Sequence, residues 1–171
     1  MIIKAKDLTK QQRQAMDHPF FGVYTKGDYD LLASIMTRYP TAVVTLETAL
    51  SLYGITDVFL APPFFLSFNI GYRPAKDDRI IQIWEDKATR LIGAELVERD
   101  GVKFLCYDKE RLLLELFRRE KLISMDAFQA AVFHYRKLAS DGALSLPRLR
   151  DYCRLLPKGD LFRERIRKEI L

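Results

Sequence analysis

The clearest pattern of apolar positions lies in residues 40–57, PTAVVTLETALSLYGITD. Residues 42–44 form a short β-prone run, and four later apolar residues recur at the spacing of one helix face: Leu46, Ala49, Leu50 and Tyr53. We therefore predict a strand followed by a compact, core-forming helix. The hydroxyl of Thr45 is expected to cap this helix, and Glu47 suits its first turn, where negative charge meets the helix dipole. Gly54 should end it, because glycine adopts the left-handed conformation at the least cost.

The residues before this stretch have a weaker pattern. Residues 7–16 are polar and predict a short helix or a mobile arm. Residues 20–25 form a β-prone run, and Asp28 is expected to cap a helix over about residues 29–39.

Four β-prone runs follow the central stretch, at residues 64–69, 80–84, 95–99 and 102–107. Asp100-Gly101 joins the last two runs, and such a pair strongly favours a two-residue hairpin. Aromatic residues on and beside the first two runs favour a core position, while base stacking beside basic residues is the alternative. These aromatic residues are Phe64, Phe65, Phe68, Tyr72 and Trp84.

After residue 107 the apolar residues recur at helical spacing. We predict four helices, starting near Asp108, Ser124, Ser145 and Asp160, with the first three of these residues as caps. In the first helix, Arg111–Glu115 and Glu115–Arg119 have the spacing of exposed ion pairs. The whole pattern predicts an α+β fold, in which a small mixed or antiparallel sheet at about residues 40–107 packs against the C-terminal helices.

Charge adds a candidate binding surface to this picture. The net charge is +5, and residues 148–169 alone hold eight basic and four acidic side chains. A local basic surface favours a polyanionic partner, DNA or RNA first, and a solvated helix face is the alternative. The candidate nucleic-acid or partner-binding residues are Arg111, Arg148, Arg150, Arg154, Lys158, Arg163, Arg167 and Lys168.

Arg111 lies where the predicted hairpin turns into a helix. Its planar guanidinium could hold a phosphate or a carboxylate of a partner. The alternative is structural: Asp108 caps the helix, and Arg111 pairs with Glu115 or ties the helix to the sheet.

No catalytic or phosphate-binding motif of the common kinds occurs in the chain. His18 and His134 are isolated, so neither a catalytic dyad nor a metal site is expected, and no cofactor is predicted. Cys106 and Cys153 lack metal-ligand spacing and are predicted to be buried, reduced thiols. We therefore predict a protein that is not an enzyme; a deep pocket with several perturbed acids would favour the opposite.

The sequence contains no apolar run of the roughly 18 residues needed to cross a bilayer. Its N-terminus, MIIKAKDLTKQQRQAM, carries charges where a signal peptide is apolar. A cytoplasmic location and no membrane partner are therefore expected.

Three segments carry a family resemblance: FFGVYTKGDYD at 20–30, RYPTAVVTLETALSLYGITD at 38–57 and VERDGVKFLCYDKERLLLELFR at 97–118. The most distinctive residues are Glu47, Thr48, Ala49, Leu50, Leu52, Gly54, Thr56 and Asp57, followed by Tyr107, Asp108, Glu110 and Arg111. Together these segments resemble the AbiEi-type antitoxins of bacterial abortive-infection, or type IV toxin–antitoxin, systems. Order and spacing agree over about residues 20–170.

The resemblance implies a protein of two parts, an N-terminal winged helix-turn-helix that binds operator DNA and a C-terminal α/β domain that carries antitoxicity. It also implies antagonism of a co-encoded toxin that resembles a nucleotidyltransferase acting on RNA, without a tight inhibitory complex. Only 19 residues precede Phe20, so residues 1–19 are expected to be an arm or a vestige of the winged domain, and residues 20–171 the antitoxin domain. The alternative function is a nucleic-acid-binding or transcriptional-regulator module that uses the basic C-terminal helices.

Overall fold

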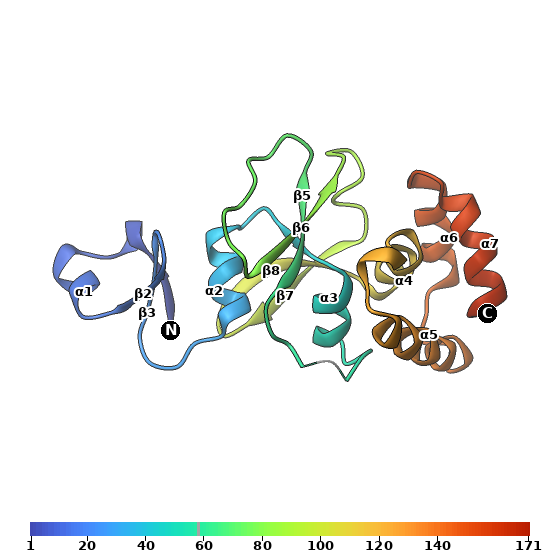
Figure 1. The fold of residues 1–171 in the computed structure, drawn as a ribbon, viewed down its shortest axis with the longest axis horizontal. Coiled ribbons are helices and arrows are strands. Elements are labelled where there is room, and N and C mark those ends of the chain that lie inside the picture. The colour runs from blue at the N-terminus through green and yellow to red at the C-terminus, as the bar shows by residue number, and fades with distance from the viewer. Residues whose placement is uncertain (58) are drawn as a thin grey trace. The chain divides into compact units, whose positions relative to one another are not determined.

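The first two thirds of the chain mix strands with short helices, and the last third is helical (Figure 1). The computed structural model describes residues 1–57 and 59–171. Its strands are β1 (Ile2–Lys4), β2 (Asp17–Phe20), β3 (Val23–Thr25), β4 (Val43–Val44), β5 (Phe64–Asn69), β6 (Ile80–Glu85), β7 (Ala94–Arg99) and β8 (Val102–Tyr107). Its α-helices are α1 (Lys10–Gln14), α2 (Leu31–Arg38), α3 (Leu46–Leu52), α4 (Lys109–Arg118), α5 (Met125–Ser140), α6 (Leu146–Leu155) and α7 (Gly159–Glu169), with short 3-10 turns η1 (Ala5–Asp7) and η2 (Glu120–Leu122). The predicted α+β class is confirmed.

The chain forms two compact units. The first consists of residues 1–42 and 96–105, and the second of residues 43–95 and 106–171. The division passes through β7 and β8, which belong to a five-stranded sheet with the order β6-β5-β4-β8-β7. The predicted Asp100-Gly101 hairpin is present, and both residues have positive φ, at 49° and 72°.

The first unit contains a three-stranded antiparallel sheet in the order β1-β3-β2, with α2 packed against it. Residues 1–19 supply β1, η1, α1 and most of β2. The cap of α2 is Asp30, whose Oδ1 accepts a hydrogen bond from the Ala33 amide at 2.8 Å. The predicted cap at Asp28 is therefore wrong by two residues. Asp30 is also fixed by an ion pair with Arg99 at 2.5 Å, which a sequence pattern does not reveal.

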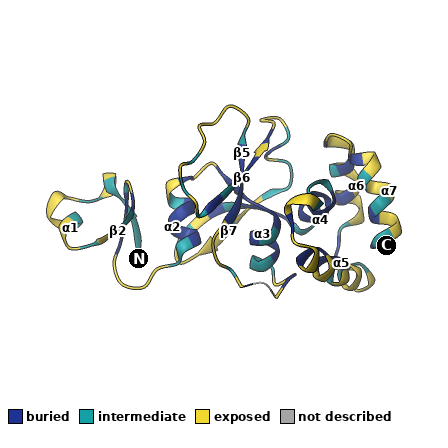
Figure 2. Ribbon diagram, in the orientation of Figure 1, coloured by how far each residue is buried: buried dark blue, intermediate teal, exposed yellow. Residues whose placement is uncertain are grey.

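The second unit is built on β5, which pairs antiparallel with β4 and parallel with β6. Three of the aromatic residues assigned to the core, Phe64, Phe65 and Phe68, are buried, as predicted. Tyr72 and Trp84 are partly exposed at the edge of this cluster, with ring centroids 5.2 and 6.3 Å from that of Phe68. Helix α3 packs on β5 and on α4, and α4 in turn contacts α6 and α7. Figure 2 shows the buried positions along β5 and α4 and the exposed outer faces of α6 and α7.

The strand and helix predicted in residues 40–57 are present, with one correction. Gly54 has φ +63°, and the Ile55 amide donates to the Leu50 carbonyl at 2.8 Å, so the helix ends as expected. Thr45 is the N-cap residue of α3, but its buried hydroxyl has no hydrogen-bond partner among the described residues. Leu46 has φ +47°, so the chain enters the helix through a left-handed residue, and the first turn does not present its amides to the Thr45 hydroxyl.

Glu47 has a specific partner outside its own helix. Its Oε1 accepts a hydrogen bond from the Ser124 amide at 2.9 Å. Ser124 is the N-cap of α5, and its hydroxyl accepts from the Ala127 amide at 3.3 Å. Glu47 therefore fastens α3 to the start of α5. The predicted caps at Asp108, Ser124 and Ser145 are all confirmed.

Candidate functional site

The side chain of Arg111 is completely buried, so it is not accessible to another molecule. Its Nε donates to Glu115 at 3.0 Å, and one terminal nitrogen donates to the carbonyls of Thr89 and Ile92 at 3.1 and 2.9 Å. The guanidinium carbon also lies 4.5 Å from the ring centroid of Tyr107. The prediction of Arg111 as a surface-binding residue is therefore wrong. The structural alternative holds, because Arg111 ties α4 to the turns between β6 and β7.

Arg111 belongs to a group of charges that we call the buried arginine cluster: Glu85, Arg111, Glu115, Arg118 and Arg119. Arg119 bridges Glu85 at 2.5 Å and Glu115 at 2.8 Å. Arg118 also contacts both carboxylates. The Arg111–Glu115 and Glu115–Arg119 pairs form as their spacing predicts, but they are buried instead of exposed. Glu85 comes from β6, so the helical spacing around Arg111 does not reveal that its carboxylate is buried beside these arginines.

The charges within this cluster shift the pKa of Glu85. Burial alone would raise that pKa, but the guanidinium groups of Arg118 and Arg119 outweigh burial, so the pKa lies below its ordinary value. The other terminal nitrogen of Arg111 is buried and has no hydrogen-bond partner among the described residues. It lies 3.9 Å from a Glu85 oxygen, so the contact is electrostatic. Each ion is thus compensated by charge, and the cluster stabilises the packing of α4.

A second polar group joins α4 to α6. Asp108 caps α4 through the Arg111 amide at 2.8 Å, and its other oxygen accepts from the Tyr152 hydroxyl at 2.7 Å. Glu110 accepts from the Ser145 amide at 2.6 Å. Burial raises the pKa of Asp108 above its ordinary value, although the Tyr152 hydroxyl and the Arg111 amide act against that rise. Arg148 lies 3.6 Å from Asp108 and is half exposed at the edge of this group.

The other predicted binding residues lie on the surface of α6, α7 and the turn between them. They are Arg150, Arg154, Lys158, Arg163, Arg167 and Lys168, and all are exposed. Three of these arginines face carboxylates of their own helix, at 3.9, 3.6 and 3.2 Å. Exposed pairs of this kind are worth about 0–1 kcal/mol, so they leave the guanidinium groups free to exchange partners. We call this set, with Arg148, the basic helical surface.

A groove between α6 and α7 lies within the basic helical surface. Its volume is about 200 Å³, and it is lined by Leu146, Leu149, Arg150, Arg163, Glu164, Ile166, Arg167 and Leu171. The floor is apolar, and three arginines stand at the rim. The sequence showed these arginines as basic positions, but it did not show that they surround exposed leucines.

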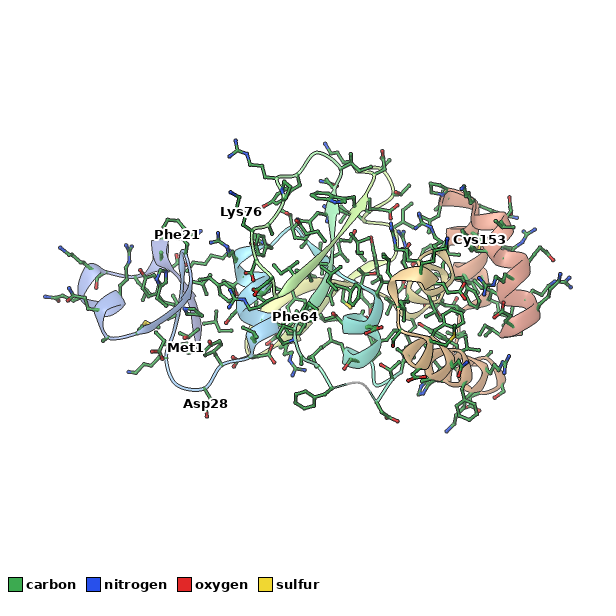
Figure 3. The ribbon with its side chains drawn as sticks, viewed as in Figure 1. Met1, Phe21, Asp28, Phe64, Lys76 and Cys153 are labelled. Atoms are coloured by element: carbon green, nitrogen blue, oxygen red, sulfur yellow. The ribbon has the colours of Figure 1, made fainter. Side chains whose placement is uncertain are left out.

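Gly159 fixes how the two helices of the groove meet. A Cβ atom on Gly159 would lie 1.9 Å from the carbonyl oxygen of Cys153, so no other residue fits there without movement of the backbone. Cys153 is buried on α6 beside this contact, where Figure 3 labels it. Cys106 is buried as well, and burial raises the pKa of its thiol to about 12. Both cysteines are free, buried thiols, as predicted.

No three His, Cys, Asp or Glu side chains gather into a possible metal site within residues 1–57 and 59–171. In that part of the chain, the helices also lack the length and apolar character that a bilayer span requires. In comparisons with known proteins, no family model and no curated protein matches the chain.

Proposed function

We propose that this chain is an antitoxin domain of a type IV toxin–antitoxin system that acts in the cytoplasm, without catalysis, against a co-encoded nucleotidyltransferase toxin. One observation carries the proposal: the three segments at 20–30, 38–57 and 97–118 resemble AbiEi-type antitoxins in order and spacing. The contacts of several motif residues are consistent with a structural role for them, since Glu47 fastens α5, Asp108 caps α4 and Arg111 is buried. Contact with other molecules is then left to the exposed residues, above all the basic helical surface.

Co-expression tests this proposal. The full chain is expressed in a bacterial host together with the nucleotidyltransferase encoded beside it, with toxin alone as the reference. Restored growth is the expected result. Growth arrest despite soluble, folded chain would contradict an antitoxin role. A further co-expression with Arg163→Glu/Arg167→Glu should reduce the rescue if the basic helical surface takes part.

A second candidate function is nucleic-acid binding or transcriptional regulation through the same surface. The observation in its favour is the excess of four positive charges in residues 148–169. Moreover, among the residues that the structure describes, no carboxylate forms an ion pair with Arg150. Phosphate neutralisation makes binding fall with salt, with a log–log slope of about −0.9 for each phosphate on duplex DNA.

Fluorescence anisotropy with labelled duplex DNA and single-stranded RNA at several salt concentrations tests this candidate. Arg163→Glu/Arg167→Glu and Arg154→Glu/Lys168→Glu should weaken binding to similar extents, because phosphate attraction depends on the charge of the whole surface. Absence of binding at low salt would contradict it.

A further inference from the structure

The groove between α6 and α7 combines an apolar floor with a basic rim. On α6, Leu146, Leu149 and Arg150 share one face at i, i+3 and i+4. On α7, Arg163, Ile166 and Arg167 repeat that spacing. Each helix therefore presents apolar side chains beside arginine: two leucines precede Arg150 on α6, and Ile166 lies between Arg163 and Arg167 on α7.

The floor of the groove is open to solvent at two of its apolar residues. Leu146 is 51% exposed and Leu171 is 57% exposed, while Leu149 and Ile166 are buried beneath them. Exposed apolar residues that line one groove with a polar rim are typical of a site that a partner covers. Nucleic acid would be attracted to the arginines but would leave the leucines in water.

The charge around the groove distinguishes between a second copy of this chain and a different partner protein. The residues around the groove include three arginines and one glutamate, so the same face of a second copy would place like charges together. A partner that carries carboxylates beside apolar side chains suits both features. Guanidinium–carboxylate hydrogen bonds are charge-assisted and about twice as strong as neutral ones, and they fix orientation as well as affinity.

We propose that the α6–α7 groove binds an acidic amphipathic helix of a partner protein. Apolar side chains of that helix enter the groove over Leu146, Leu149 and Ile166, as in other helix-in-groove complexes. Its flanking carboxylates pair with Arg150, Arg163 and Arg167. Arg163 forms an exposed ion pair with Asp160, and Arg167 forms one with Glu164; a docked helix can replace both pairs. This inference goes beyond the proposed function, because it does not depend on whether the partner is a toxin.

The probe for the test is a fluorescein-labelled helical peptide of about 16 residues, with leucines at i, i+3, i+4 and i+7 and glutamates beside them. The reference is a scrambled peptide of the same composition. Anisotropy titrations use the full chain. We expect the amphipathic peptide to bind at least about tenfold more tightly than the scrambled one.

Variants of the chain locate the site. Leu146→Asp changes the floor, and Arg163→Glu/Arg167→Glu reverses the rim; each should weaken peptide binding about tenfold or more. Arg154→Glu/Lys168→Glu makes the same change in net charge at one position of α6 and one of α7, outside the groove lining, and should change binding less than about threefold. Circular dichroism verifies that each variant is folded. If Arg163→Glu/Arg167→Glu does not fold, Arg150→Glu tests the rim in its place.

Three outcomes would overturn the groove proposal. The first is equal or undetectable binding of the two peptides. The second is an equal loss in the two double variants, which would indicate diffuse charge attraction, as for nucleic acid. The third is a concentration-dependent dimer that Leu146→Asp abolishes, which would mean that a second copy covers the groove. Failed growth rescue with intact peptide binding contradicts only the antitoxin function, and intact rescue without peptide binding contradicts only the groove.

Discussion

The second unit contains two sets of arginines whose environments are opposite. In the buried arginine cluster, the side chains of Arg111 and Arg119 are 0% and 20% exposed, and both touch carboxylates of α4 and β6. On the basic helical surface, the side chains of Arg163 and Arg167 are 46% and 67% exposed, and their ion pairs are with carboxylates of their own helix. A buried guanidinium must be compensated by fixed partners, whereas an exposed one remains hydrated. The positive charge of the second unit therefore divides into a part that stabilises the fold and an exposed part that a binding partner can reach.

The strongest test of this division is Arg111→Met. The substitution leaves Glu115 and Glu85 buried with fewer cations and removes two hydrogen bonds to carbonyls. Loss of one member of a buried ion pair costs about 3–5 kcal/mol. We expect the lower part of that range, because Arg118 and Arg119 still face both carboxylates. Urea unfolding measures it. A loss below about 1 kcal/mol would mean that the cluster contributes little.

Glu85→Gln sharpens the comparison through pH. Because the pKa of Glu85 is lower in the folded state, the ionised carboxylate stabilises the fold above the ordinary glutamate pKa, and this contribution disappears as pH falls through the lowered value. At neutral pH the variant should be about 1–3 kcal/mol less stable. The difference should shrink as pH falls below about 4.5. A difference that stays constant with pH would contradict the assigned charge effect.

Glu47→Ala tests a partly exposed carboxylate, whose burial lies between that of the buried arginine cluster and that of the basic helical surface. It removes the hydrogen bond to the Ser124 amide, and loss of such a capping contact costs about 1 kcal/mol. Thermal unfolding measures the loss, with Glu47→Gln as the matched control because its amide oxygen can still accept the bond. The proposed antitoxin activity should be unaffected in the folded variant. Selective loss of antitoxicity would place Glu47 at a contact surface instead.

The smallest effect on stability is expected on the basic helical surface. Arg163→Ala/Arg167→Ala removes only exposed intrahelical pairs, so unfolding should change by about 0.5 kcal/mol or less for each site. Binding of the acidic peptide should weaken all the same. If the double variant instead unfolds as readily as Arg111→Met, the division between structural and available arginines is incorrect.

Most elements of the fold could be predicted because their signals are local. The apolar spacing in residues 64–69 and 109–118 and the caps at Asp108, Ser124 and Ser145 depend on neighbours a few residues away. Asp28 and Asp30 are both good caps by type, and the choice between them depends on how the chain leaves β3. The predicted capping hydrogen bond of Thr45 is wrong for a similar reason, since the residue types do not reveal the left-handed backbone at Leu46.

The candidate site was only partly predictable. Charge along the chain located the basic residues of α6 and α7, and the structure places them on the surface. It could not show that Arg111 is buried, because its environment depends on Glu85 and on carbonyls about 20 residues away. The Glu47–Ser124 contact spans 77 residues and has no sequence signature. The groove arises only when α6 and α7 pack, which places Arg150 beside Arg163 and Arg167.

The close approach of Gly159 to Cys153 has a consequence for redesign of this protein. This contact leaves no room for a side chain at Gly159, where α7 follows α6. The rim residues Arg150, Arg163 and Arg167 are exposed, so the fold places no such restriction on them. Recognition and folding are therefore encoded at separate positions of the same helix pair. Directed evolution of those rim positions, with Gly159 held constant, should yield chains of altered partner preference on an unchanged scaffold.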